Sequence, residues 1–119
     1  MQSLKTTRQF SYVYKKGVKR HHEFFVLYCL PLEHLHREFL GAHASLLGLS
    51  VSKKVGNAVR RNLIKRRVRS IFQHVPLQCP QAIVFVAKAG VGQLDYATLR
   101  THILQCLAQK KRIRTKVPK

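Results

Sequence analysis

Acidic residues are scarce in this sequence of 119 residues. It contains four of them, Glu23, Glu33, Glu38 and Asp95, and none lies between the last two. Protein nucleases that cut with two metal ions need clustered carboxylates, which four scattered acids do not supply. The sequence therefore disfavours a metal-dependent nuclease with its own active site, and we expect no catalytic residues in this chain. Any cleavage chemistry is expected on a partner.

Cysteines and long apolar runs are also few. The three cysteines, at positions 29, 79 and 106, form no CxxC pair, which argues against a disulfide framework and against a zinc site. No apolar run approaches the roughly 20 residues of a membrane-spanning helix, and the N-terminus lacks the apolar stretch of a signal peptide. We therefore expect a cytoplasmic protein that needs no membrane, with no metal site and with reduced thiols.

Positive charge is abundant. Lysine and arginine together number 23, the formal net charge is +19 and the pI is near 10.9. A compact chain with this charge repels itself, and binding to a polyanion relieves the repulsion. RNA, DNA and an anionic membrane surface are the candidate partners. Because 45% of the residues are hydrophobic, we expect one folded domain over residues 1–119, with a core of about 6–110 and a basic tail at 111–119.

The pattern of apolar residues predicts a mixed α+β domain with helices packed on a small sheet. Thr6 and Gln9 have the spacing of a capping box before the first helix. Asp95 is expected to cap the last helix. The expected helices are about 7–16, about 57–74 and one after residue 95, and the expected strands are 24–32, 46–53 and 82–87, with a variable, histidine-containing connection over 32–44.

The helix over 57–74 carries the most informative pattern. On a helix of 3.6 residues per turn, its apolar residues form one stripe that should pack on the sheet: Ile64, Val68, Ile71 and Phe72. Polar and basic residues at i, i+3, i+4 and i+7 share a second face: Asn62, Lys65, Arg66 and Arg69. Like charges at these spacings destabilise an isolated helix. The absence of acids among them therefore favours a face that binds phosphates or bases over a merely solvated one.

Two further features lie beside this helix. Gly56 and Asn57 open it, and the free N–H groups of a helix N-terminus can receive a phosphate, with Lys53 and Lys54 directly before it. Aromatic residues can stack on bases in single-stranded RNA, and the candidates are Phe10, Tyr14 and Tyr28. For Phe10, packing in the core remains the favoured alternative. We assign four other phenylalanines to the core: Phe24, Phe25, Phe72 and Phe85.

Histidines offer an alternative chemistry. The pairs His21–His22 and His34-x-His36 have residue types used for acid–base catalysis or for metal binding. Both pairs lie in expected loops, and the sequence places no second catalytic or metal-binding group beside them. We therefore treat a protein-only nuclease as the least favoured hypothesis.

One long stretch of the sequence resembles a known family. The residues GLSVSKKVGNAV at 48–59, followed by RRNLIKRRVRSIF at 60–72, resemble the signature of the bacterial ribonuclease P protein subunit. Supporting matches are FSYVYKKG at 10–17, FVLY at 25–28 and the strand and helix over 82–107, so that the resemblance covers about residues 6–110.

The resemblance implies a fold and a function. The fold is an α/β sandwich like domain 2 of ribosomal protein S5, with the order α-β-β-β-α-β-α and a left-handed βαβ crossover. The family's holoenzyme is an endoribonuclease that removes the 5′ leader of precursor tRNA. Its RNA subunit is the catalyst and uses Mg²⁺, and one protein binds that RNA and the leader. A ribosomal or general RNA-binding protein with no role in cleavage is the alternative.

The resemblance also implies which residues bind RNA. The leader-binding set is Phe10, Tyr14, Tyr28, Asn62, Arg66 and Arg69, and the set that contacts the catalytic RNA is Lys53, Lys54, Arg60, Arg61, Lys65 and Arg67. The sequence departs from the family pattern at Leu63, where a basic residue is frequent. It also departs at Arg67, where an apolar residue is common, and at Tyr14, where phenylalanine is frequent.

Overall fold

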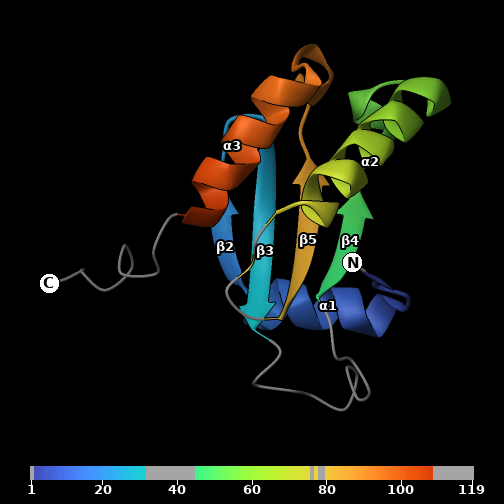
Figure 1. Ribbon diagram of the computed structural model, residues 1–119. Helices are drawn as coiled ribbons and strands as arrows, with labels where there is room; N and C mark the ends of the chain where they lie inside the picture. Colours follow the sequence, from blue (N-terminus) through green and yellow to red (C-terminus); the bar gives the residue numbers. More distant parts are fainter. Residues whose placement is uncertain (1, 32–44, 76, 78–79, 109–119) are drawn as a thin grey trace, which may run out of the picture.

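Within the residues that the structure describes, three α-helices pack on the two faces of a twisted sheet (Figure 1). The computed structural model describes residues 2–31, 45–75, 77 and 80–108. The helices are α1 (Thr7–Lys16), α2 (Ala58–Gln73) and α3 (Tyr96–Ala108), with short 3-10 turns η3 (Lys53–Val55) and η4 (Val91–Gln93). The strands are β1 (Gln2–Ser3), β2 (Val18–His21), β3 (Phe25–Pro31), β4 (Leu46–Ser50) and β5 (Gln81–Ala87).

The predicted α+β class is confirmed, and three differences stand out. The residue pattern placed His21 and His22 in a loop, but Val18–His21 pairs antiparallel with β3, in agreement with the three strands that the resemblance implies between the first two helices. The two residues of β1 pair with β4 and were not predicted. The strand expected over 46–53 ends at Ser50, and residues 53–55 form the turn η3 instead. The connection over 32–44 and the tail over 111–119 lie outside the described residues.

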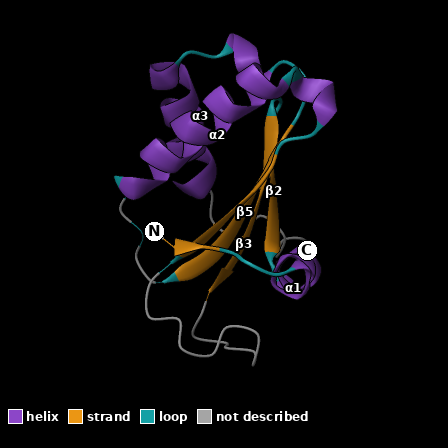
Figure 2. Cartoon of the chain, turned by 90° about the vertical axis from the view of Figure 1, so that its right-hand side faces the viewer, coloured by secondary structure: helices purple, strands orange, loops and turns teal. Residues whose placement is uncertain are grey.

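The sheet has the strand order β1-β4-β5-β3-β2. Parallel strands β4 and β5 are adjacent, and α2 connects them. In Figure 1 both strands point upward, α2 lies in front of the sheet and β5 lies to the left of β4, while Figure 2 shows α2 and α3 together on one face. The crossover is therefore left-handed, which is rare among such connections and confirms the prediction. The likeness to ribosomal protein S5 stays a prediction.

Two apolar clusters hold the layers together. The larger one joins the sheet to α2 and α3 and includes Phe25, Phe72 and Phe85, while Phe24 packs against it from a half-buried position. The smaller one joins the other face of the sheet to α1, where Val13 is fully buried. Because α1 covers this second face with one short helix, the side chains around it remain open to solvent at its edges.

Side-chain caps fix where the helices begin. The predicted capping box of α1 is present, because the Thr6 hydroxyl oxygen accepts a hydrogen bond from the Gln9 N–H at 3.1 Å and the Gln9 side chain accepts one from the Thr6 N–H. The predicted cap of α3 is present as well, since Asp95 Oδ1 accepts from the Thr98 N–H at 2.7 Å. That hydrogen bond lowers the pKa of Asp95 below its usual value.

The β2–β3 turn and α3 are held together by polar and aromatic contacts. The Arg20 guanidinium donates a hydrogen bond to the Cys106 carbonyl oxygen at 3.1 Å, near the end of α3. The His22 ring stacks on Phe25 at 4.3 Å between centroids and lies 4.5 Å from the ring of His102 on α3. Burial raises the pKa of the Cys106 thiol, which therefore stays protonated at neutral pH.

His22 makes this junction sensitive to pH. Burial lowers the pKa of its imidazole, and the neighbouring His102 and Lys88 lower it further, while Glu23 acts in the opposite sense. The unfolded chain takes up this proton at an ordinary pKa of about 6.5, whereas the folded chain takes it up only at lower pH. Its contribution to the free energy of unfolding is therefore complete above the unfolded pKa of about 6.5 and is lost as the pH falls through the lower folded pKa.

Replacing the imidazole with a group that does not titrate should remove this loss. His22→Asn keeps an acceptor for the Phe24 N–H, which His22 Nδ1 binds at 3.1 Å. We expect the free energy of unfolding, measured by urea denaturation, to fall less between about pH 7.5 and about pH 5.5 in His22→Asn than in the unchanged protein. The exposed His21→Asn is the control. An equal fall in His22→Asn and the unchanged protein would show that His22 does not cause it.

Candidate RNA interface

The apolar stripe of α2 seats the helix on the sheet. Ile64, Val68, Ile71 and Phe72 are all buried, as the periodicity predicted. Asn57 caps the helix, because its side-chain oxygen accepts a hydrogen bond from the Arg60 N–H at 2.9 Å. With one face fixed in this way, the basic residues on the remaining faces are directed to the surface and to the neighbouring elements.

A groove runs along the side of the sheet formed by β1 and β4, between α2 and α1. We call it the edge groove. Its first part is lined by Ser3, Leu4, Phe10, Leu47, Gly48, Leu49, Lys65, Arg69 and Gln73. Its second part is lined by Lys5, Thr6, Thr7, Phe10, Tyr14, Leu49 and Ser50. Phe10 and Leu49 line both parts, so the two parts are neighbours, one reaching α2 and the other reaching α1.

The charges around the edge groove have one sign. Lys5, Lys65 and Arg69 are among its lining residues, and no carboxylate is. Within the part of the chain that the structure describes, the acids are Glu23, in the β2–β3 turn, and Asp95, at the start of α3. Neither reaches the groove. A surface that combines uncompensated cations with an aromatic ring suits the backbone and bases of single-stranded RNA.

The three predicted aromatic residues lie side by side as a row. The ring centroids of Phe10 and Tyr14 are 6.4 Å apart, and those of Tyr14 and Tyr28 are 4.9 Å apart with the rings nearly perpendicular. Phe10 packs against the smaller apolar cluster, as the core interpretation expects, and it also lines the edge groove. Its stacking on RNA stays a prediction. Tyr14 is 39% exposed, which leaves ring surface available for stacking.

Only part of the polar face of α2 lies in the edge groove. Lys65 and Arg69 line the edge groove beside Phe10. Asn62 and Arg66 are exposed on the same helix but are not among the lining residues. The resemblance had grouped Arg66 with Arg69 for the leader and had placed Lys65 against the catalytic RNA. The geometry instead brings Lys65 together with Arg69.

The opposite flank of α2 contacts the η4 segment. The Arg67 guanidinium donates a hydrogen bond to the Leu94 carbonyl oxygen at 3.1 Å. Arg60 passes over Gly92, where an added Cβ would lie 3.1 Å from the Arg60 guanidinium. Arg61 is half-buried. Arg60 and Arg67 therefore help to join α2 to the region before α3, and their guanidinium groups retain further donors for a ligand.

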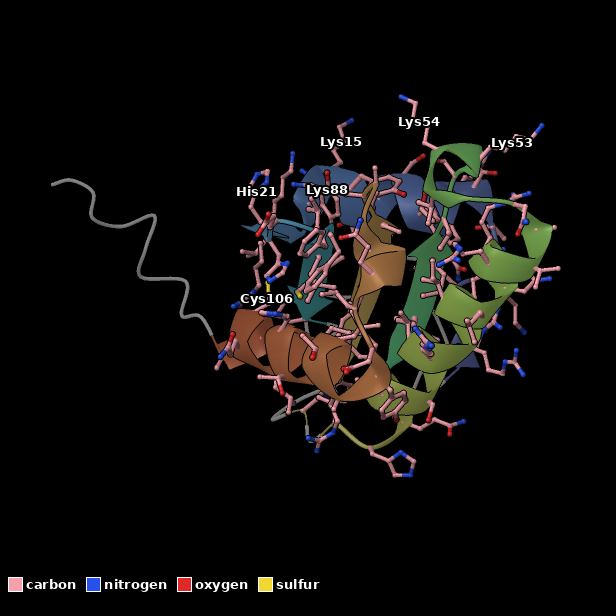
Figure 3. The ribbon with its side chains drawn as sticks, turned by 90° about the horizontal axis from the view of Figure 1, so that it is seen from above. Lys15, His21, Lys53, Lys54, Lys88 and Cys106 are labelled. Carbon is pink, nitrogen blue, oxygen red and sulfur yellow. The ribbon has the colours of Figure 1, made fainter. Side chains whose placement is uncertain are left out.

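The residues before α2 form an exposed basic corner. Figure 3 shows Lys53 and Lys54 extending from η3 away from the body of the protein. Both side chains are exposed. Because Asn57 binds only the Arg60 N–H, the N–H groups of Ala58 and Val59 in the first turn of α2 are left without a helical partner. The predicted phosphate position at this helix start thus has both exposed lysines and backbone donors.

Sequence reasoning missed several residues of the surface. Gln73 lines the edge groove, and its signal was available, because it follows Arg69 by four residues on the same helical face. Lys5 lines the groove from the segment before α1, and Ser50 lines it from β4. Their positions depend on how these two elements approach each other in space, so no local pattern could have identified them.

Neither a metal cluster nor a membrane span is found within the described ranges. No three histidine, cysteine, aspartate or glutamate side chains there come together as ligands for a metal ion. Likewise, the helices in that part of the chain are too short or too polar to cross a bilayer.

Comparisons with known proteins give consistent results. Residues 1–111 match the family model described as ribonuclease P. A ribonuclease P protein component from Helicobacter acinonychis is 44% identical over 119 residues, covering 92% of this chain and 78% of the relative. The solved ribonuclease P protein from Staphylococcus aureus superposes with a TM-score of 0.75 at 29% identity, covering 90% of this chain and 93% of the other. The solved ribonuclease P protein from Thermotoga maritima superposes with a TM-score of 0.72 at 27% identity, covering 92% of this chain and 99% of the other.

Proposed function

Since this chain belongs to the ribonuclease P protein family, we propose that it binds the catalytic RNA subunit and the 5′ leader of precursor tRNA. In that role it assists the endonucleolytic removal of the leader that gives the mature 5′ end. The edge groove is the observation that carries this proposal. It brings the aromatic row and uncompensated cations together beside the helix that bears the family signature.

The leader is proposed to lie in the edge groove and along the aromatic row. Phe10, Tyr14 and Tyr28 offer faces for stacking, and Arg69 offers a planar set of donors for phosphate. Lys65 joins this set because it lines the same groove. Asn62 and Arg66 are proposed at its outer rim, where they are exposed on α2.

The catalytic RNA is proposed to contact the basic corner and the start of α2. Lys53 and Lys54 are exposed there, next to the first turn of the helix. Arg60, Arg61 and Arg67 extend this surface along α2 towards η4. The leader and the catalytic RNA would then occupy neighbouring sides of one helix, which lets the protein position one relative to the other.

The chemistry is proposed to reside in the RNA subunit. When bound there, Mg²⁺ supplies the activated water and stabilises the leaving oxygen of the scissile phosphate. This chain contributes binding: it neutralises phosphates of both RNAs and holds the leader in a fixed position. In the cytoplasm, such neutralisation lowers the magnesium concentration that the two RNAs need to associate.

A reconstitution separates this proposal from its alternatives. The protein alone, the family's RNA subunit alone and the two together are incubated with precursor tRNA at low magnesium. We expect efficient leader removal only from the mixture. Cleavage by the protein after all RNA has been removed would contradict the proposed division of labour.

Crosslinking in cells provides an independent test of the partner. The RNA joined to the protein is sequenced, and we expect the ribonuclease P RNA and precursor tRNAs to dominate. Recovery of ribosomal RNA in their place would favour a general RNA-binding protein with no part in cleavage.

A further inference from the structure

The aromatic row continues beyond the predicted residues to a lysine on the edge strand β2. Lys19 lies directly opposite Tyr28 in the antiparallel register of β2 and β3. Its ammonium nitrogen is 5.7 Å from the centroid of the Tyr28 ring, within the range of a cation–π contact. Tyr28 in turn contacts Tyr14, and Tyr14 contacts Phe10. One continuous path therefore leads from the edge groove to the opposite edge of the sheet.

The Lys19 ammonium group contacts a ring and is still available to a ligand. The side chain is exposed. Within the described part of the chain its ammonium group makes no hydrogen bond or ion pair, and the Tyr28 ring is its contact. A ring face attracts the cation without using any of its three N–H donors in a hydrogen bond. Those donors remain free for a phosphate, while the ring limits where the ammonium group can move.

The face on which Lys19 lies is set by strand alternation. In β2, Lys19 and His21 are exposed, whereas Val18 and Arg20 are half-buried. Arg20 is directed to the α3 side of the sheet, where it binds the end of α3. Its neighbour Lys19 therefore lies on the other side, which α1 covers in part. Lys19, at the end of the aromatic row, thus lies on the same face of the sheet as α1, which carries Phe10 and Tyr14.

We propose that Lys19 binds a phosphate near the free 5′ side of the leader and so sets how much of the leader this protein contacts. This inference rests on the proposed function. The catalytic RNA is proposed to contact α2 and η3, and we place the cleavage site near that end of the path. The leader then runs from the edge groove past Phe10, Tyr14 and Tyr28, and its upstream nucleotides reach Lys19. A leader that ends within the groove does not reach it.

The test is a series of leader lengths. Holoenzyme is assembled with the unchanged protein or with Lys19→Gln, and its affinity for precursor tRNAs with leaders of about 1 to 12 nucleotides is measured. We expect the same affinity for both proteins with short leaders and a roughly three- to tenfold loss for Lys19→Gln above a threshold length. The log–log salt slope should become shallower by about 0.7 for long leaders alone, as for the loss of one phosphate contact.

Two further variants make the result specific. Arg100→Gln removes one positive charge from an exposed position on α3, and we expect it to leave the length profile unchanged. Lys19→Arg keeps a cation near the Tyr28 ring and should restore the affinity for long leaders. A Lys19→Gln profile identical to that of the unchanged protein, or an equal loss at every length, overturns the role of Lys19. If the unchanged holoenzyme gains no affinity from a longer leader, the proposed leader binding is overturned as well.

Discussion

Replacing Lys65 and Arg69 together with glutamine should weaken the binding of leader-bearing precursor tRNA by about a hundredfold. Each side chain lines the edge groove beside Phe10, and a hydrogen bond to a charged partner contributes about 1.5–3 kcal/mol. A loss of roughly 1.4 kcal/mol per contact corresponds to tenfold in affinity. Mature tRNA, which lacks the leader, should lose far less. The measurement is equilibrium binding of both RNAs to the assembled holoenzyme.

The paired control lies on the same helix. Asn62→Ala with Arg66→Gln changes two exposed residues of α2 that do not line the groove. We expect a smaller loss, within about tenfold. This comparison decides between two assignments, because the family resemblance places Arg66 with Arg69 whereas the geometry places Lys65 there. A larger loss from the control pair would favour the resemblance and contradict the geometric assignment.

Gly48→Ala should destabilise the protein and deform the edge groove. A Cβ at this position would lie 2.5 Å from Phe10 Cε1 and 2.8 Å from Leu4 Cδ1, so the Phe10 ring has to move. Overpacking of this kind typically costs about 1–3 kcal/mol. We expect the free energy of unfolding to fall by that amount in urea denaturation. Because the displaced ring lines both parts of the groove, leader binding should weaken with it.

A double-mutant cycle tests the stated cause. In a Phe10→Ala background the ring is gone, so the additional cost of Gly48→Ala should fall to well under 1 kcal/mol. Gly92→Ala is the matched control, because its added Cβ would meet only the flexible end of Arg60, at 3.1 Å. If Gly48→Ala costs the same with and without the Phe10 ring, the ring is not what limits the size of residue 48.

The two predictions describe different properties of one surface. Lys65 and Arg69 supply charge, while Gly48 allows the Phe10 ring to lie close to β4. Charge acts on affinity and on its salt dependence, whereas the glycine acts through stability and groove shape. We therefore measure the affinity for leader-bearing RNA and the free energy of unfolding for each variant. Together they separate electrostatic binding from the packing that positions the aromatic row.

Local sequence patterns were enough for the helices and their caps. The spacing of Thr6 and Gln9 predicted the start of α1, and the apolar period predicted the buried stripe of α2. These features depend on residues within a few positions of one another, which is the range over which helical hydrogen bonds and caps act. The scarcity of acids and the run of arginines likewise pointed to a polyanion without any knowledge of the fold.

Pairing between distant segments was beyond such patterns. The residues of β2 show only a weak alternation of buried and exposed side chains. The strand is stabilised by its antiparallel pairing with β3, and this pairing places Lys19 opposite Tyr28. Which residues of α2 face the groove depended on how β1, β4 and α1 meet at the sheet edge. Periodicity tells which side chains share a face of a helix, but not what lies opposite that face.

The sequence by itself thus determined the fold class, the cationic helix and the family of this protein, because each is encoded in composition or in contiguous residues. The tertiary structure decided that Lys65 accompanies Arg69 in the edge groove. It also decided that the aromatic row ends at Lys19. The physical reason is that these neighbours come from separate elements, and strand register and helix packing alone set the distances between them.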